Sequence, residues 1–239
     1  MQWGSVTLAA VRLDAVDRDG VTGGIGDSVL NSIPNRVFPL HPVELARANS
    51  MAVGRERDRF LNGRIAVRRF AAELLGTRAE DLLLDYACAN CGLSGAIDHG
   101  RPGYRAPASG REVRLSLSRS GLWCLLAATT DPAVAAVGAD LEDTARAGFA
   151  GFDEVVLTPR ERALLNGVGD ESRASALRAQ LWSRKEAFLK ATGAGLFREP
   201  SSVEASDDRF EGIELADIDP AALGLPAELV AAVAIRRLD

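Results

Sequence analysis

Two acidic residues stand two positions apart in Asp140-Leu141-Glu142, at the end of Val134–Glu142, a segment whose alternating pattern predicts a strand. Because successive side chains of a strand point to opposite faces, both carboxylates are expected on one face. Two like charges held together suit either a solvated strand end or a divalent metal ion bound by oxygen ligands. The pair alone leaves both interpretations open.

A second group of polar residues recurs at helical spacing. A helix is predicted from about Ser172 to Thr192, ended by Gly193, and Trp182, Glu186 and Lys190 share one face of it at i, i+4 and i+8. An exposed Glu–Lys pair at this spacing is usually a surface ion pair worth a few tenths of a kcal/mol. The apolar stripe of the same helix is formed by Leu177, Leu181 and Phe188.

Arginines are concentrated on an earlier predicted helix, Glu56–Leu75, which ends at Gly76. Its apolar stripe is formed by Phe60, Val67, Ala71 and Leu74. A neighbouring row holds Arg57, Arg64 and Arg68, while Arg59 and Arg69 lie elsewhere on the cylinder. The row is either a solvated basic face or a site for a polyanionic ligand, since the planar guanidinium binds phosphate oxygens in pairs.

Cysteines at positions 88 and 91 form a C-x-x-C motif, which is half of a zinc ribbon. His99 and Cys124 are the only further ligands of that kind within reach, so the motif is a weak signal for zinc. His99-Gly100-Arg101-Pro102, which follows it, is predicted to be a turn.

The remaining segments predict a mixture of strands and helices that alternate weakly in each half. A helix is expected to open near Pro42, and Thr158-Pro159-Arg160-Glu161 is a strong helix start with a capping box. The glycine-rich Gly20–Gly26 lacks the Gly-Lys-Ser/Thr ending of a phosphate-binding loop and is expected to be a surface loop. Further strands are predicted at Ser5–Leu13, Val113–Leu117, Leu122–Ala128, Phe210–Leu215 and Leu229–Ile235.

Length and composition limit the class of protein. The 239 residues suffice for one or two domains, and 47% hydrophobic with 26% charged residues is a globular balance. The net charge of -5 argues against a general nucleic-acid binder. No apolar run is long enough to span a membrane, the start lacks a secretory signal, and three cysteines are not a disulfide framework. A cytoplasmic protein with reduced thiols is therefore expected.

Two of these segments together resemble the signatures of the Sfp-type 4′-phosphopantetheinyl transferases. Gly138–Glu142 is similar to the family pattern Gly-x-Asp-x-Glu, and Trp182–Lys190 is similar to Trp-x-x-Lys-Glu-(Ala/Ser)-x-x-Lys, with Asp140 and Glu186 separated by 46 positions. Other similar features follow in the right order: the Arg-bearing helix around Arg59–Arg64, the Gly-Arg-Pro loop at 100–102, Ser116–Ser120 and Leu157–Glu161.

The resemblance implies an α+β fold with two similar halves related by a pseudo-twofold, each a long helix packed on a small antiparallel sheet, with the ligand cleft between them. The halves are expected at residues 1–120 and 121–239. It also implies the transfer of phosphopantetheine from coenzyme A to a serine of an acyl or peptidyl carrier protein, with release of 3′,5′-adenosine bisphosphate. The carrier would belong to polyketide, nonribosomal-peptide or fatty-acid assembly, and a monomer is expected because one chain forms the whole cleft.

Site roles follow from the same resemblance. Mg²⁺ would be held by Asp140, Glu142 and Glu186, and Glu186, Asp140 and Lys190 would be catalytic, with Glu186 as a candidate base. Coenzyme A would be bound by Arg57, Arg59, Arg64, Arg101, Ser118, Arg119, Lys185 and Lys190.

The sequence departs from the family at Arg119, where the Ser-His-Ser segment has histidine. Arginine keeps a positive charge for phosphate but is longer and cannot change tautomer. The alternative function is therefore a catalytically silent member that binds coenzyme A or a carrier protein as a regulator.

Overall fold

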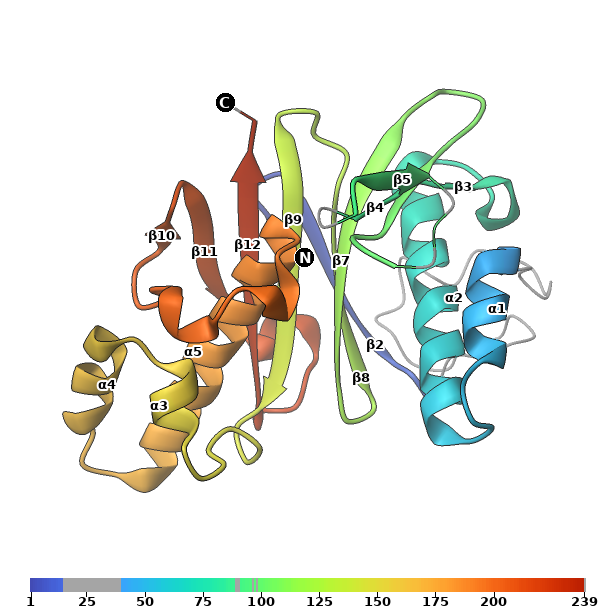
Figure 1. The fold of residues 1–239 in the computed structure, drawn as a ribbon. Helices are drawn as coiled ribbons and strands as arrows, with labels where there is room; N and C mark the ends of the chain where they lie inside the picture. The colour runs from blue at the N-terminus through green and yellow to red at the C-terminus, as the bar shows by residue number, and fades with distance from the viewer. Residues whose placement is uncertain (15–39, 89–90, 96, 98, 239) are drawn as a thin grey trace.

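Two antiparallel sheets form the frame of the molecule (Figure 1). The computed structural model describes residues 1–14, 40–88, 91–95, 97 and 99–238. The larger sheet has the strand order β1-β2-β8-β7-β6-β3. Its strands are β1 (Gln2–Trp3), β2 (Val6–Arg12), β3 (Leu83–Leu84), β6 (Gly103–Arg105), β7 (Glu112–Ser120) and β8 (Trp123–Thr129).

The smaller sheet has four strands in the order β10-β11-β12-β9. They are β9 (Val134–Asp143), β10 (Arg209–Phe210), β11 (Ile213–Ile218) and β12 (Leu229–Arg237). A separate two-stranded hairpin is formed by β4 (Tyr86–Cys88) and β5 (Leu93–Gly95).

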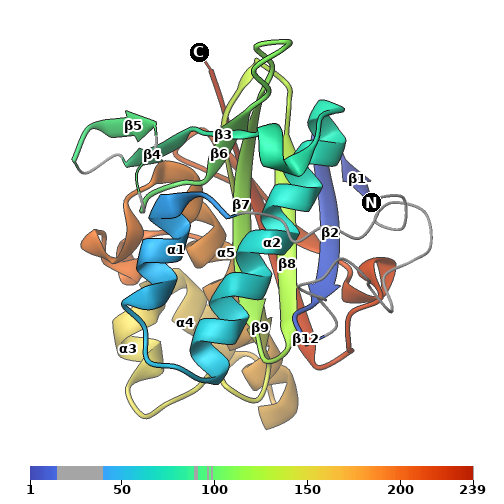
Figure 2. The ribbon, with the colours of Figure 1, turned by 90° about the vertical axis from the view of Figure 1, so that its right-hand side faces the viewer.

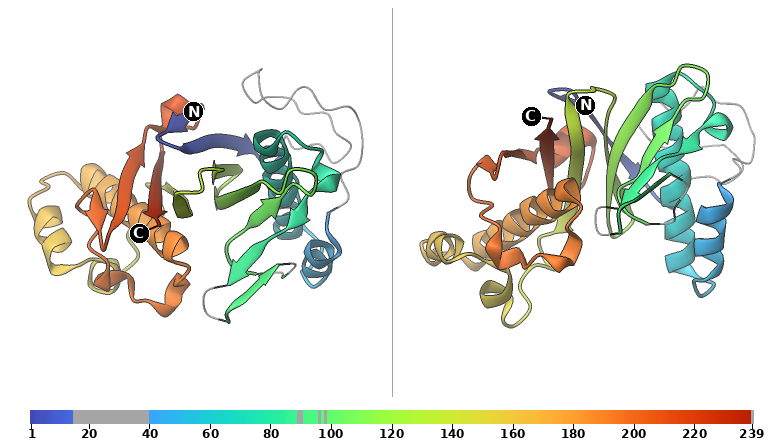
Figure 3. Two further views of the ribbon diagram at one scale, coloured as in Figure 1. Left: turned by 90° about the horizontal axis from the view of Figure 1, so that it is seen from above. Right: turned by 45° about the horizontal axis from the view of Figure 1, so that its top comes forward.

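One long helix covers the six-stranded sheet, and another covers the four-stranded sheet. Helix α2 (Arg55–Leu75) packs on β7 and β8, with α1 (Pro42–Asn49) beside it, as Figure 2 shows. Helix α5 (Glu171–Thr192) packs on β9, β12 and β11, and the short helices α3 (Phe152–Val156) and α4 (Pro159–Asn166) precede it. Seen from above, α2 and α5 lie on opposite outer sides of the molecule (Figure 3). The predicted α+β class, with a long helix on an antiparallel sheet in each half, is confirmed.

Three hydrophobic cores hold these layers together. The first lies between α2 and the six-stranded sheet, and the second lies between α5 and the four-stranded sheet. The third joins the two sheets, where Leu8 and Leu125 pack with Val137, Leu141 and Val233. Because β7 and β8 contact β9 directly, the ends of these strands are brought together from both halves.

Local signals place the helix ends as predicted. Gly76 and Gly193 end α2 and α5 in the left-handed conformation, with φ of 63° and 75°. Thr158 caps α4 in a full capping box with Glu161. The predicted loop at Gly20–Gly26 lies outside the described residues.

The border between the halves differs from the expected one. Strand β8 follows residue 120 yet pairs with β2 and β7 in the larger sheet, so sheet membership changes between Thr129 and Val134. The reason is the tight β7–β8 turn at Gly121, which returns the chain into the same sheet. In the described part of the chain, no helix is long and apolar enough to span a membrane.

Candidate active site between the two sheets

The predicted acidic strand face and the predicted polar helix face meet in the structure. Asp140 Oδ1 on β9 accepts a hydrogen bond from Lys190 Nζ on α5 at 2.6 Å and one from Ser118 Oγ on β7 at 2.7 Å. Further along the same strand, Trp182 Nε1 donates to Glu142 Oε1 at 3.1 Å. Residues 140 and 142 therefore both face α5, and Trp182 and Lys190, two turns apart on one face of that helix, contact them, which confirms both predictions.

A close approach of α5 to β9 makes this contact possible. A Cβ atom added to Gly138 would lie 1.8 Å from the carbonyl oxygen of Ala187 and 2.7 Å from the amide nitrogen of Ala191. Only glycine fits beneath the helix at this position. The glycine of the Gly-x-Asp-x-Glu segment thus sets the depth at which the helix lies over the acidic strand.

The carboxylates of the site are short of neutralising partners. The Asp140 side chain is only 3% exposed, and its buried Oδ2 atom has no hydrogen-bond partner. Burial, and then the charge of Asp140, raise the pKa of Glu142 to about 7. Burial also raises the pKa of Glu186, Asp140 adds to that rise, and Lys190 opposes it. The three acids therefore belong to one electrostatic cluster in which one lysine is the nearest counter-charge.

The composition of this cluster suits a hard divalent cation. Its donors are carboxylate oxygens, one of them a buried oxygen without a partner, and Mg²⁺ prefers such ligands. Among the described residues, Cys88, Cys91 and His99 form a group whose ligand atoms all lie within 4.8 Å of one another, and the three carboxylates do not form such a group. The carboxylate oxygens are therefore spaced more widely than the ligands of a fully protein-bound metal ion. Mg²⁺ usually keeps several waters, which accommodates the wider spacing. The residues present therefore fit the expected ion.

A basic pocket of about 350 Å³ opens next to the acids. Its cationic walls are Arg64 from α2, Arg119 from β7 and Lys190 from α5. The Arg119 side chain is exposed. Even so, partial desolvation lowers the pKa of its guanidinium, and the charges of Arg64 and Arg59 lower that pKa further. Three cations line this recess, and although Lys190 also pairs with Asp140, their charges together favour an anionic ligand.

Arg64 is held in this recess by an aromatic and acidic network. Its guanidinium donates to the hydroxyl of Tyr86 and lies 5.1 Å from the ring centre of Phe60. The Tyr86 hydroxyl in turn donates to the buried Glu44 at 3.3 Å. Burial, as the largest cause, raises the pKa of Tyr86 to about 12, so the hydroxyl stays neutral. Tyr86 therefore positions Arg64 without adding a charge.

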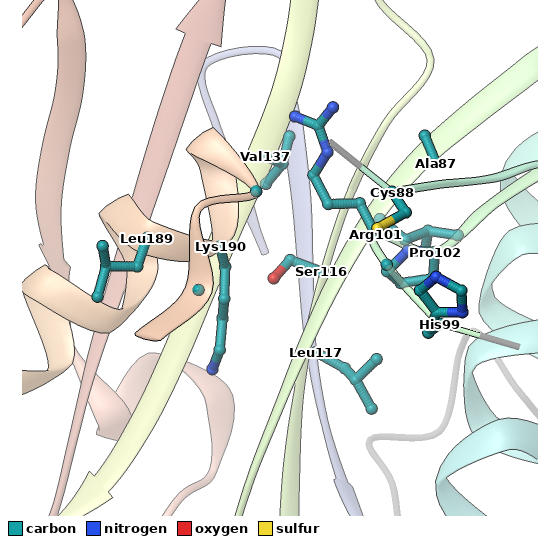
Figure 4. A pocket seen from close by; sticks show the side chains of 14 residues that line it. Ala87, Cys88, His99, Arg101, Pro102, Ser116, Leu117, Val137, Leu189 and Lys190 are labelled. Carbon is teal, nitrogen blue, oxygen red and sulfur yellow. The ribbon is translucent and has the colours of Figure 1, made fainter. Parts of the chain in front are cut away.

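A second pocket, of about 380 Å³, adjoins the first and shares Lys190 with it (Figure 4). One wall includes Arg101 and Pro102, directly before β6, and the opposite wall includes Val137 of β9 and Leu189 of α5. Nη1 of Arg101 donates to the carbonyl oxygen of Ala191, at the C-terminal end of α5, at 3.0 Å. Arg101 therefore bridges the halves. Its pKa is lowered by burial, and then by the neighbouring charges of Arg236 and Arg114.

Three predicted ligands of coenzyme A lie away from these pockets. Lys185 is fully buried in the C-terminal core, where Nζ forms an ion pair with Glu161 Oε2 at 2.7 Å, so its predicted contact with phosphate is wrong in this geometry. The reason is helical: a residue next to Glu186 is turned by about 100° away from its face. Arg57 donates to Asn49, and Arg59 pairs with Glu56 at 3.1 Å and lines a different pocket.

Arg68, the last member of the predicted arginine row, is also structural. It is buried, pairs with Glu44 at 3.4 Å and donates to the carbonyl oxygens of Ala79 and Leu82. The row therefore divides, with Arg64 in the pocket and Arg68 in the core. Spacing along one helix could not distinguish them, because their partners come from other segments.

The sequence interpretation missed several residues that shape the site. Trp182 lies on the predicted helix face, but its hydrogen bond to Glu142 depends on the tertiary fold. Tyr86 and the pair Arg114 and Arg236 had no local signal, since each acts on a residue distant in the chain.

Comparison with known proteins agrees with this geometry. Residues 136–232 match the family model of the 4′-phosphopantetheinyl transferase superfamily, and this segment carries Asp140, Glu142, Glu186 and Lys190. This part of the chain is similar to the 4′-phosphopantetheinyl transferase superfamily. The predicted resemblance is therefore confirmed.

One curated relative in the superfamily is the 4′-phosphopantetheinyl transferase HetI of Nostoc sp. (strain PCC 7120), which is 31% identical over 156 residues. The match covers 64% of this chain and 59% of HetI, so the chain spans less than two thirds of the relative's length. A crystal structure of holo-ACP-synthase from Plasmodium yoelii aligns with a TM-score of 0.34 and 18% identity, over 43% of this chain and 93% of that one. A similarity at that TM-score is too low to describe the fold further.

Proposed function

We propose that the protein transfers 4′-phosphopantetheine from coenzyme A to a serine of an acyl or peptidyl carrier protein and releases 3′,5′-adenosine bisphosphate. The observation that carries this proposal is the position of Lys190, which lies between an acidic cluster and a basic pocket and contacts both. A phosphoryl transfer from a polyanionic donor needs both features, one for a metal ion and one for phosphates.

The basic pocket suits the donor. Coenzyme A carries a pyrophosphate and a separate phosphate on its ribose, and Arg64, Arg119 and Lys190 provide cations from three elements. Charge-assisted hydrogen bonds from guanidinium groups to phosphate are among the stronger polar contacts in proteins. Arg101 lines the adjoining pocket, and the charges of Arg114 and Arg236 lie near enough to act on it, which makes a second basic group. Two basic groups allow the pyrophosphate and the ribose phosphate to be bound separately.

Mg²⁺ would be held by Asp140, Glu142 and Glu186. When bound, the ion would neutralise charge on the pyrophosphate of coenzyme A. Trp182 fixes the orientation of Glu142, and Ser118 fixes that of Asp140, so the chain itself holds two of the three carboxylates in place.

The reaction assigns each remaining group a task. The serine hydroxyl of the carrier attacks the phosphorus next to the pantetheine, the bond from that phosphorus to the bridging oxygen breaks, and the adenosine bisphosphate leaves with that oxygen. Glu186 is the candidate that accepts the serine proton, directly or through water. Lys190 stabilises a phosphate oxygen, for which its side chain is 29% exposed and its ammonium already lies at the site beside Asp140.

The carrier would be an acyl or peptidyl carrier of fatty-acid, polyketide or nonribosomal-peptide assembly. Since both walls of the pockets come from one chain, the protein is proposed to act as a monomer. The departure at Arg119 favours one other candidate, a silent member that binds coenzyme A or a carrier without transfer.

Intact mass spectrometry of the carrier distinguishes the two candidates. An apo carrier incubated with the protein, coenzyme A and Mg²⁺ should gain the mass of one phosphopantetheine, and a carrier with its serine changed to alanine should not. Binding of coenzyme A by calorimetry without a mass gain would support the silent candidate. Absence of both would contradict both functions.

A further inference from the structure

The C-x-x-C motif and His99, which the proposed reaction does not use, come together in the structure. Sγ of Cys88, Sγ of Cys91 and a ring nitrogen of His99 all lie within 4.8 Å of one another. Cys91 Sγ and His99 Nε2 are 3.3 Å apart. Two thiols and an imidazole in this arrangement are the donors that zinc prefers.

The backbone fixes this arrangement through contacts of its own. Strand β4 ends at Cys88, which pairs with Leu93 of β5, so Cys91 lies in the turn of the hairpin. Gly92, directly after it, has φ of 63°, a conformation that favours glycine and allows the chain to reverse. The hairpin therefore places Cys88 at the end of β4 and Cys91 directly before Gly92.

His99 is brought to the hairpin by a second set of backbone contacts. The amide of Ala87 donates to Arg101 O at 3.0 Å, and the amide of Arg101 donates to Ala87 O at 2.8 Å. Gly100, with φ of 89°, lies so close that an added Cβ would be 2.4 Å from Ala87 O. These bonds place residue 99 next to the end of β4, whichever side chain it carries.

We propose that Cys88, Cys91 and His99 bind one Zn²⁺ ion through two thiolates and one imidazole nitrogen. Zinc–sulfur bonds of about 2.3 Å and zinc–nitrogen bonds of about 2.1 Å at a tetrahedral angle separate sulfur from nitrogen by about 3.6 Å. The observed 3.3 Å between Cys91 and His99 needs only a small adjustment to reach this value. Among the described residues the group has three members, so the fourth position is open to water.

The site has a structural consequence for the pocket beside it. Cys88 and His99 line the pocket of about 380 Å³ together with Arg101, as Figure 4 shows. A bound ion would join the hairpin to the segment that carries Arg101, in addition to the bonds at Ala87. The three ligands are therefore positioning residues for this wall, and the inference does not depend on the transferase reaction.

Metal analysis of the purified full chain tests the site directly. The protein is produced with zinc in the medium, kept under reducing conditions without chelator, and analysed by plasma mass spectrometry. We expect close to one zinc ion per chain. Cys91→Ser should lose the metal, and because Cys91 is exposed this change leaves the cores untouched. Cys124→Ala is the matched control. Cys124 is buried on β8 and is not one of the three ligands, so this variant should retain its full zinc content.

Cobalt provides a second measurement, which is made first on the wild-type protein. Wild-type protein stripped of metal and titrated with Co²⁺ should develop a thiolate-to-cobalt charge-transfer band that saturates at one equivalent and is lost in Cys91→Ser and His99→Ala. Wild-type protein with neither zinc nor this band would overturn the proposal. So would full zinc content in Cys91→Ser, or a Cys88–Cys91 disulfide in protein purified under reducing conditions.

Discussion

Lys190 Nζ lies 2.6 Å from Asp140 Oδ1, and this ion pair joins helix α5 to strand β9 at the point where the basic pocket begins. The Asp140 side chain is 3% exposed and the Lys190 side chain is 29% exposed. The carboxylate is therefore enclosed, while the lysine ammonium still reaches the pocket. The same carboxylate accepts from Ser118, which brings in the larger sheet. One buried acid thus connects both halves of the molecule.

Gly138, two positions before Asp140, should not tolerate any side chain. In Gly138→Ala the new methyl group would lie 1.8 Å from Ala187 O, so α5 must move away from β9. Overpacking of this kind costs about 1–3 kcal/mol or more of unfolding free energy. Urea denaturation followed by circular dichroism measures the loss. Gly169→Ala is the control, because no atom lies within 4 Å of the added Cβ; equal stability of the two variants would contradict the close approach.

Adjacent lysines on α5 should have opposite phenotypes. Lys185→Met leaves Glu161 as a fully buried charge without its ion-pair partner, which costs about 3–5 kcal/mol of unfolding free energy. Lys190→Met removes a partly exposed ion pair and should lower the stability far less, while transfer to the carrier is lost. Urea denaturation and the carrier mass assay on both variants check this. A Lys190→Met protein with full transfer would remove Lys190 from the site.

Tyr86 should affect coenzyme A binding through Arg64. Tyr86→Phe removes the hydroxyl that accepts from the Arg64 guanidinium, and loss of one such hydrogen bond, worth about 1 kcal/mol, weakens binding by about fivefold. Tyr104→Phe is the matched control, because its hydroxyl also donates to Glu44, at 3.2 Å, but the Arg64 bond stays intact. Calorimetric titration with coenzyme A gives both affinities. If the two variants bind alike, Tyr86 has no special role.

Arg119 should be a phosphate ligand. Arg119→Ala should weaken coenzyme A binding and reduce the dependence of the affinity on salt, because one cation is lost from the pocket. Arg57→Ala removes the same charge from α2, where the side chain bonds Asn49, and should change the affinity little. Titrations at several salt concentrations compare them. An affinity of Arg119→Ala that equals that of the wild type at every salt concentration rejects the role.

Local patterns in the sequence predicted most of the frame. The glycines at 76 and 193 and the capping box at Thr158 depend on neighbouring residues only, and each helix end is found there. The shared face of Trp182, Glu186 and Lys190 follows from helical geometry and was also predictable.

Long-range contacts decided the rest. Lys185 and Lys190 belong to one motif, yet the partner of Lys185 is Glu161, which only the tertiary fold brings beside it. Arg101 reaches the end of α5 across 90 positions of sequence. Arg64 and Arg68 are one helical turn apart, and the surroundings alone send one into a pocket and the other into the core. No spacing rule contains this information.

We propose that the carboxylates of β9 and α5 are required for transfer. The most direct test compares wild-type protein and Glu186→Gln under one set of conditions, with coenzyme A, Mg²⁺ and an apo carrier, by intact mass of the carrier over time. The amide retains the size of the side chain and the buried face of α5, so circular dichroism should show an unchanged fold. We predict that the carrier gains one phosphopantetheine with the wild type and none with Glu186→Gln. Equal mass gain with both proteins, or none with the wild type, would contradict the claim.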